Sequence, residues 1–448
     1  MGNLSTPKSV QKLRTALHAK AKAEAGYRFY ALYDKISRDD ILAHAYAQCR
    51  SNKGAPGVDS QDFADVEAYG VERWLGELAL ALREETYQPA PIRRVYIPKA
   101  NGKLRPLGIS TLRDRVCMTA AMLVLDPIFE ADLPPEQYAY RPGRNAGQAV
   151  AEVGGLLFRG YRDVVDADLA DYFGSIPHAD LLKSLARRIV DRRVLHLIRM
   201  WLECPVEETD DRGRKTRTTE AKDSRRGIPQ GSPISPLLAN LYMRRFVLGW
   251  KKLGLEQSLH SRIVTYADDL VILCRKGNAE AALLRLREIM GRLKLTVNEE
   301  KTRICKVPEE AFDFLGWTFG RIYSAKTGKA LLGNRPSKKA IRRAVETIHA
   351  LTVRATTWQD TAEAGGQGEP GAARLGQLLP CWPCQQSLPG ARQPRSPAGA
   401  PVVAQQAQGR TKQEWDLSTL APLRVLRARA SDRARARPAV GEGVMSCP

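Results

Sequence analysis

Two adjacent carboxylates, Asp268 and Asp269, lie between apolar runs at 264–266 and 270–273. The runs are rich in β-branched residues and predict two strands, and the Ala-Asp-Asp between them predicts the turn of a hairpin. Successive side chains on a regular strand point to opposite faces, so both carboxylates can serve one site only at a turn. The pair is either a solvated hairpin tip or a set of metal ligands for phosphoryl transfer, and the second interpretation requires a third carboxylate elsewhere.

A second acidic strand supplies candidates for that third carboxylate. In the run at 164–169, Asp166 and Asp168 share one face, and the apolar residues between them share the other. Stacked carboxylates repel each other unless a cation lies between them or one of them is solvated. The spacing alone leaves open which of the two is the ligand.

Two further stretches could position a nucleotide. An Asn-Gly turn predicts a hairpin over 93–109, which places Lys99 and Arg105 on facing strands. These cations are either solvated edge-strand charges or a clamp on a triphosphate. The loop at 225–236 holds three prolines and two glycines around Gln230 and precedes a predicted helix. A rigid loop that opens a helix can position a nucleotide or can serve as a structural connection.

The elements around these stretches are mostly helical. Spaced apolar residues predict basic helices from about 8 to 50, and further helices over 63–85, 113–129, 237–250 and 279–295. A basic turn at 141–145 is a candidate phosphate contact. An aromatic run at 312–319 predicts a short strand, whose simplest role is core packing.

Composition narrows the class of partner. The chain has 448 residues, enough for two or three domains, and 70 Lys and Arg against 49 Asp and Glu give a net charge of +21. Without a long apolar stretch, this excess favours a polyanionic partner, nucleic acid before membrane. Eight cysteines without framework spacing suit a reduced cytoplasm, and the N-terminus lacks the apolar core of a signal peptide.

These stretches, in this order, closely resemble the reverse transcriptase/maturase proteins encoded by bacterial group II introns. The likeness runs from about residue 53 to about residue 363. It rests on an ordered series of segments rather than on one motif: 54–59, 98–109, 140–144, 168–173, 227–233, 266–269, 295–302 and 314–317. The resemblance implies an α+β right-hand polymerase with fingers and an antiparallel palm sheet, followed by a partial helical thumb.

The resemblance also implies roles for single residues. It selects Asp168 rather than Asp166 to hold two Mg2+ ions together with Asp268 and Asp269. One ion would lower the pKa of the primer 3′-hydroxyl, and the other would neutralise charge on the leaving pyrophosphate. Nucleotide-binding residues are implied at Lys99, Arg105, Phe173, Gln230 and Lys301, with Phe173 as the aromatic gate against a ribose 2′-hydroxyl. The primer grip is implied at Leu315, Gly316 and Trp317.

RNA contacts are expected from basic side chains. They are the turn residues Arg141 and Arg144 and one helical surface formed by Lys338, Lys339, Arg342 and Arg343. One departure lies inside the series: many relatives have Asp where Gly174 stands here. That Asp is not a metal ligand, so we expect catalysis to survive its loss.

We expect four segments. They are a basic helical N-terminal extension (1–90), fingers and palm (91–325), the start of the maturase thumb (326–363) and an aberrant tail (364–448). The tail has few large apolar residues, which predicts disorder. Its abrupt shift to Arg with almost no Lys motivates the hypothesis that it is translated out of frame. Cys381 and Cys384 lack the second Cys pair or nearby His that a zinc site needs.

The sequence therefore predicts an RNA-directed DNA polymerase that copies intron RNA and assists splicing. Its partners would be group II intron RNA, a DNA target or primer and deoxynucleoside triphosphates, with no membrane. Two alternatives remain open. One is an RNA-binding, maturase-like remnant without polymerase activity, and the other is a reverse transcriptase of another lineage, such as a retron or defence-associated enzyme.

Overall fold

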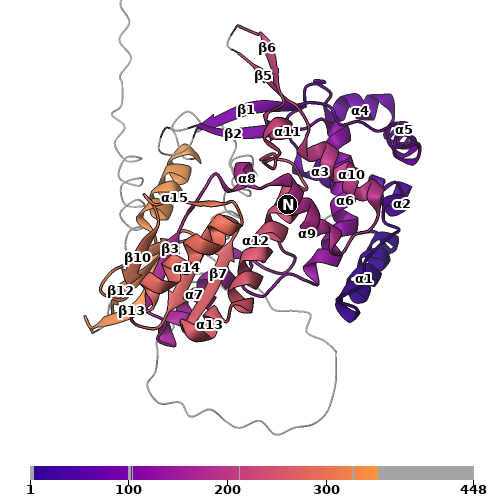
Figure 1. Cartoon of the computed structure of the whole chain (residues 1–448). Coiled ribbons are helices and arrows are strands. Elements are labelled where there is room, and N and C mark those ends of the chain that lie inside the picture. The colour runs from indigo at the N-terminus through magenta and orange to yellow at the C-terminus, as the bar shows by residue number, and fades with distance from the viewer. Residues whose placement is uncertain (1–4, 99–101, 103, 211, 325–326, 352–448) are drawn as a thin grey trace, which may run out of the picture. The chain divides into compact units, whose positions relative to one another are not determined.

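The computed structural model describes residues 5–98, 102, 104–210, 212–324 and 327–351 (Figure 1). Lys99 and the predicted tail, with its two cysteines, lie outside the described residues. The fold is α+β with mainly antiparallel sheets, as the sequence predicts. Among the helices described, none has both the length and the apolar character needed to cross a membrane.

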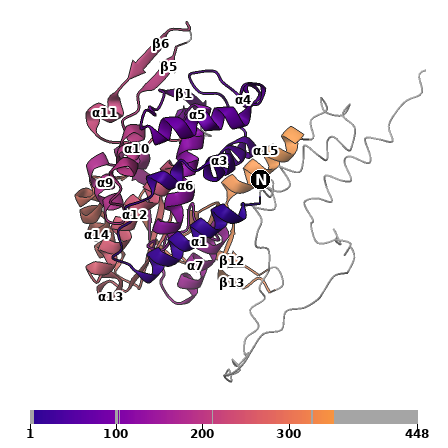
Figure 2. The same cartoon turned by 90° about the vertical axis from the view of Figure 1, so that its right-hand side faces the viewer.

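The N-terminal helices pack around one buried helix, α6 (Leu112–Glu130). Most residues on all sides of α6 are buried, as expected for a helix that is apolar around its whole circumference. Figure 2 looks onto this group, in which α1, α2 and α3 contact α6 directly. The predicted helix over 63–85 is divided at Gly70, whose φ of +103° ends the first helix. The surrounding helices are α1 (Lys8–Ala23), α2 (Tyr33–Ile36), α3 (Asp39–Asn52), α4 (Phe63–Tyr69) and α5 (Val71–Arg83).

The predicted hairpin over 93–109 is confirmed as β1 (Ile92–Pro98) and β2 (Leu104–Ile109). β5 (Val206–Thr209) pairs parallel with β1, and β6 (Lys215–Thr218) pairs antiparallel with β5. We call these four strands the hairpin sheet (β2-β1-β5-β6). The sequence analysis had not predicted β5 and β6.

A second sheet carries the acidic strands, and we call it the carboxylate sheet (β10-β3-β8-β7). Its strands, all antiparallel to their neighbours, are β3 (Asp163–Ala167), β7 (Ser261–Tyr266), β8 (Asp269–Cys274) and β10 (Arg303–Lys306). Alternate residues of these strands enter two hydrophobic clusters. One cluster includes residues of α12 (Ser235–Lys252) and α14 (Ala279–Arg292), and the other includes residues of α7 (Ala146–Phe158). Apolar packing on both faces therefore fixes the sheet, and only its strand ends are left for polar chemistry.

The aromatic run at 312–319 is a hairpin rather than the single strand predicted. β11 (Phe312–Phe314) and β12 (Trp317–Tyr323) are joined by Leu315 and Gly316, both with positive φ. Phe312 and Phe319 face each other across it, with ring centroids 5.2 Å apart. β13 (Ala330–Pro336) completes this sheet, and α15 (Lys338–Leu351) follows it.

The remaining elements are short. β4 (Leu169–Ala170) pairs with β9 (Thr296–Val297), directly after the first acidic strand. The other helices are α8 (Tyr172–Ser175), α9 (His178–Ala186), α10 (Arg192–Leu202), α11 (Glu220–Ser224) and α13 (Leu255–Ser258).

Candidate active site

The predicted carboxylates meet at one end of the carboxylate sheet. β8 pairs with β3 on one side and with β7 on the other, so that Leu270 lies opposite both Ala167 and Thr265. Asp168 directly follows β3, and Asp268 lies in the two-residue turn between β7 and β8. Ala267, the other turn residue, has a φ of +58°, a left-handed conformation that costs energy for any residue other than glycine.

Electrostatic coupling shows that these carboxylates lie within one another's field. Burial, and then repulsion from Asp268, Asp168 and Asp166, raise the pKa of Asp269 to about 6, and Lys301 opposes the shift. Asp269 keeps an exposed surface, so solvent screens part of this repulsion. The site therefore concentrates negative charge that it does not itself fully neutralise.

Each of the two candidate carboxylates on the first acidic strand has its own cationic partner. Asp168 accepts hydrogen bonds from Lys301 Nζ (2.9 Å) and Asn298 Nδ2 (3.1 Å), both at Oδ2. Asp166 instead pairs with Arg303 Nε at 3.2 Å, and burial raises its pKa. Sequence reasoning missed Asn298 and Arg303. Arg303 begins β10 and lies opposite Asp166 of β3, a pairing between distant segments that local spacing does not reveal.

The donor set fits a divalent cation. In the part of the chain that the structure describes, no three His, Cys, Asp or Glu side chains already form a metal-ligand cluster. A cation binds the charged form of a carboxylate and so relieves the repulsion that raises the pKa of Asp269. Sites made only of carboxylate oxygens suit hard cations such as Mg2+. Asp168, Asp268 and Asp269 are therefore the candidate ligands.

We expect Asp269→Asn to stabilise the metal-free protein at about pH 8. The folded-state pKa of about 6 lies above the usual 3.8, so protonation of Asp269 stabilises the fold. That contribution is complete below about pH 3.8 and is lost as the pH rises through about 6. Because Asn mimics the neutral acid, the gain in melting temperature should be present at pH 8 and shrink towards pH 4. Thermal melts in EDTA measure it, with exposed Glu300→Gln as control, and an equal gain at both pH values would contradict the assignment.

Backbone hydrogen bonds join the segments that carry three nucleotide-binding candidates: the loop around Gln230 contacts both Phe173 and the strand of Arg105. Ile228 N donates to Phe173 O (2.8 Å), and Gly108 N of β2 donates to Gln230 O (2.7 Å). A Cβ at Gly231 would lie 2.5 Å from Gly108 O, so only glycine permits this close approach. Arg105 is exposed on the same strand, opposite Ile97.

The departure at Gly174 has a structural counterpart. A Cβ at this position would overlap the carboxylate of Asp171, three residues earlier. Asp171 adopts a left-handed conformation, with a φ of 42°. This chain therefore carries a carboxylate in the space beside Gly174, although it comes from a different residue.

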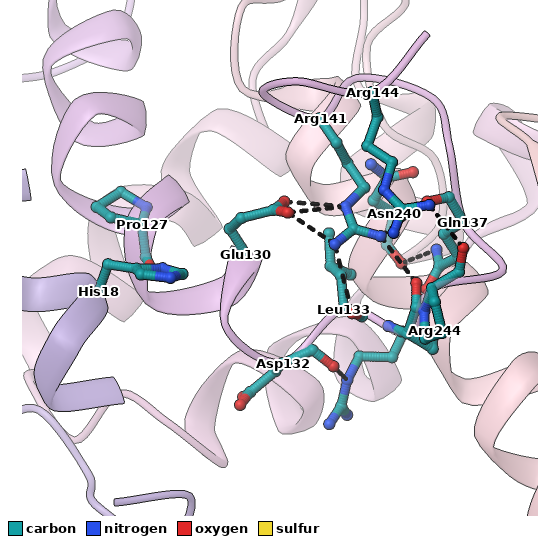
Figure 3. Close-up of polar contacts among 12 residues, drawn as sticks. His18, Pro127, Glu130, Asp132, Leu133, Gln137, Arg141, Arg144, Asn240 and Arg244 are labelled. Carbon is teal, nitrogen blue, oxygen red and sulfur yellow. Dashed lines mark hydrogen bonds and ion pairs between the residues drawn. The ribbon is translucent and has the colours of Figure 1, made fainter. Parts of the chain in front are cut away.

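The predicted RNA contact at Arg141 is corrected by the structure. Its side chain is 6% exposed and pairs with Glu130 at 2.7 Å. Further hydrogen bonds from its guanidinium reach the carbonyl oxygens of Pro134 (2.8 Å) and Gln137 (2.7 Å) (Figure 3). A guanidinium whose donors already bind protein acceptors holds the turn from within rather than facing a phosphate.

The other predicted RNA contacts are more open. Arg144 is half-buried, donates to Pro135 O at 2.9 Å and lies over the ring of Tyr138. The four predicted basic residues of α15 are all exposed: Lys338, Lys339, Arg342 and Arg343. Of the predicted primer grip, Leu315 and Gly316 form the turn before β12, and Trp317 begins that strand beside the cluster that includes α7.

Comparisons with known proteins show which proteins the chain is similar to. The family described as reverse transcriptase (RNA-dependent DNA polymerase) matches residues 97–319. Protein YkfC from Escherichia coli K12 is 32% identical over 381 residues, which cover 74% of this chain and 93% of that protein. Group II intron-encoded protein LtrA from Lactococcus lactis is 31% identical over 303 residues, 64% of this chain but 48% of LtrA. The putative COX1/OXI3 intron 1 protein of Saccharomyces cerevisiae is 26% identical, with 62% of this chain and 38% of that protein covered.

Proposed function

The chain belongs to the reverse transcriptase/maturase family of group II intron-encoded proteins, and we propose that it copies intron RNA into DNA at a two-Mg2+ site. The observation that carries this proposal is the pairing of β8 with β3 and β7, which brings Asp168, Asp268 and Asp269 to one end of one sheet. We assign the carboxylate sheet to the palm, the hairpin sheet to the fingers and α15 to the start of the thumb.

In the mechanism, the chain's own residues hold and orient the reactants. Bound divalent ions would lower the pKa of the primer 3′-hydroxyl and neutralise charge on the departing pyrophosphate. Asp168, Asp268 and Asp269 would hold these ions, while Arg303 keeps the neighbouring carboxylate of Asp166 paired. The proposed triphosphate contacts are Arg105, Gln230, Lys301 and Lys99, the last of which lies outside the described residues.

Splicing assistance is proposed for the basic surfaces. Arg144 and the exposed basic residues of α15 would contact the phosphates of intron RNA. This chain spans almost all of YkfC but about half of LtrA, so activities that belong to the rest of LtrA are not assigned to it.

Primer extension tests the proposal. The purified full-length chain, a DNA primer on an RNA template, deoxynucleoside triphosphates and Mg2+ should give extended primer. RNA binding without extension would favour the maturase-like remnant instead. Flanking DNA that lacks intron RNA domains would favour a reverse transcriptase of another lineage.

Phe173→Ala is expected to weaken discrimination against ribonucleotides by about tenfold or more, because a steric gate loses its bulk. The ring of Phe173 is half-buried against Tyr172, with centroids 5.6 Å apart, so it is held in a fixed orientation. The ratio of kcat/KM for dCTP to that for CTP measures the effect, and Phe173→Tyr, which keeps the ring, is the matched control. An unchanged ratio in the Ala variant would remove Phe173 from the gate role.

A further inference from the structure

Tyr140 reaches the carboxylate end of the sheet through a pairing between distant segments. Gln137 forms a parallel bridge with Thr265 of β7. Thr265 N donates to Glu136 O (2.9 Å), and Tyr138 N donates to Thr265 O (3.0 Å). Because the two segments run in the same direction, the chain leads from Gln137 towards the end of β7, and Tyr140 interacts electrostatically with Tyr266 and Asp268 there.

The conformation of Tyr140 is unusual for a large aromatic residue. Its φ is +57°, and its side chain remains 51% exposed. A non-glycine residue stays left-handed only where the surrounding structure enforces it, and such residues concentrate at functional sites. The exposed ring and the enforced backbone therefore occur together.

A buried network on both sides of Tyr140 provides this enforcement (Figure 3). Asn240 of α12 donates from its side-chain Nδ2 to Ala139 O (2.7 Å). The backbone carbonyl oxygen of Asn240 accepts a hydrogen bond from Gln137 Nε2 (3.0 Å). Arg141 binds back to Gln137 O and to Glu130. Both neighbours of Tyr140 are thus fixed from the interior, while Tyr140 itself stays about half exposed.

The Tyr140 hydroxyl interacts electrostatically with charged groups of both sheets. After burial, the carboxylate of Asp268 is the largest cause that raises the pKa of Tyr140, and Asp269 adds to it. Arg105, on the hairpin sheet, acts in the opposite direction. The ring therefore lies within the field of both the proposed metal ligands and a proposed triphosphate contact.

We propose that Tyr140 is a nucleotide-contacting residue whose ring packs against a nucleoside of the base pair being formed beside Asp268. This inference rests on the proposed function. The ligand is either the incoming deoxynucleotide or the 3′-terminal nucleotide of the primer, which present the same sugar and base surfaces. An aromatic ring suits this task because every base offers a face for stacking, whatever the sequence.

The test compares Tyr140→Ala, Tyr140→Leu and Tyr140→Phe in the full-length chain. We expect the Ala variant to bind nucleotide about tenfold more weakly, the Leu variant to recover little and the Phe variant to match wild type, because the ring makes the contact. Affinities for the primer–template, and for the next deoxynucleotide on that complex, are measured in Ca2+ to avoid turnover. A weaker affinity for the primer–template identifies the primer terminus as the ligand of Tyr140. A weaker affinity for the next deoxynucleotide identifies the incoming nucleotide.

Tyr30→Ala is the matched control, since this tyrosine is 71% exposed in a segment remote in sequence from the carboxylates. Melting temperatures show whether a loss of affinity in the Ala variant arises from misfolding. If it does, the affinities of the Leu and Phe variants decide whether the ring makes the contact. Unchanged affinities in folded Ala and Leu variants would overturn the inference. A wild type that binds primer–template but never extends it in Mg2+ would overturn the proposed function, while the binding comparison would still decide the role of Tyr140.

Discussion

Asp268→Asn should reduce DNA synthesis on an RNA template by roughly a thousandfold or more, because a charged metal ligand becomes a neutral amide. RNA affinity should stay within about twofold, since phosphate contacts depend on basic residues elsewhere. The amide has nearly the shape of the acid, so the turn between β7 and β8 should persist. Primer extension and filter binding on the same preparation measure the two quantities. Equal losses in both would show that Asp268 shapes the fold instead.

Asp166→Asn and Asp168→Asn form a matched pair that tests the choice of the third ligand. Both carboxylates belong to the same acidic strand, but Asp166 pairs with Arg303 whereas Asp168 contacts Lys301 and Asn298. Asp168→Asn should match the loss at Asp268, and Asp166→Asn should leave synthesis within a few-fold of wild type. A larger loss of synthesis in Asp166→Asn than in Asp168→Asn would make Asp166 the third ligand instead.

Arg141→Ala should lower the free energy of unfolding by about 3–5 kcal/mol, the cost of leaving a buried ionic partner without its counter-charge. Glu130 and the carbonyl groups of Leu133, Pro134 and Gln137 would all lose a donor. Lys should not rescue the fold, because one ammonium cannot reproduce a guanidinium that binds in several directions. Denaturant titration followed by circular dichroism measures the change.

Arg144→Ala is the control for this variant, since Arg144 lies in the same turn and keeps part of its surface open. It should cost little stability and should weaken RNA binding. If the two alanine variants destabilise the protein equally, the interior role of Arg141 is wrong.

Local patterns were enough to predict the hairpins. The β-branched runs around Asp268 and the Asn-Gly at 101–102 are each signals of a few residues, and both predicted strand pairs are present. The helices around α6 were likewise predicted from the spacing of apolar residues. In these stretches, residue type, turn residues and the spacing of apolar side chains were enough to predict the element.

Contacts between distant segments were beyond the reach of local patterns. Arg141 looked like a surface cation because its counter-charge, Glu130, lies on the preceding helix and its acceptors are backbone carbonyls. The bridge between Gln137 and Thr265 joins two segments with no shared local pattern. The turn at Leu315 and Gly316 is a different case, because Gly316 is itself a local turn signal that the prediction of one strand over 312–319 passed over.

The order of strands in the carboxylate sheet also bears on biosynthesis. Among the strands that the structure describes, β3 pairs only with β8 and β10, and both are encoded about a hundred residues or more downstream of it. While the ribosome makes that intervening stretch, an apolar strand has neither edge occupied, which is the condition under which nascent chains associate wrongly. Slower translation after the β8 codons could not protect β3, because it would act only once this unpaired interval is over. A chaperone bound to β3 before then could.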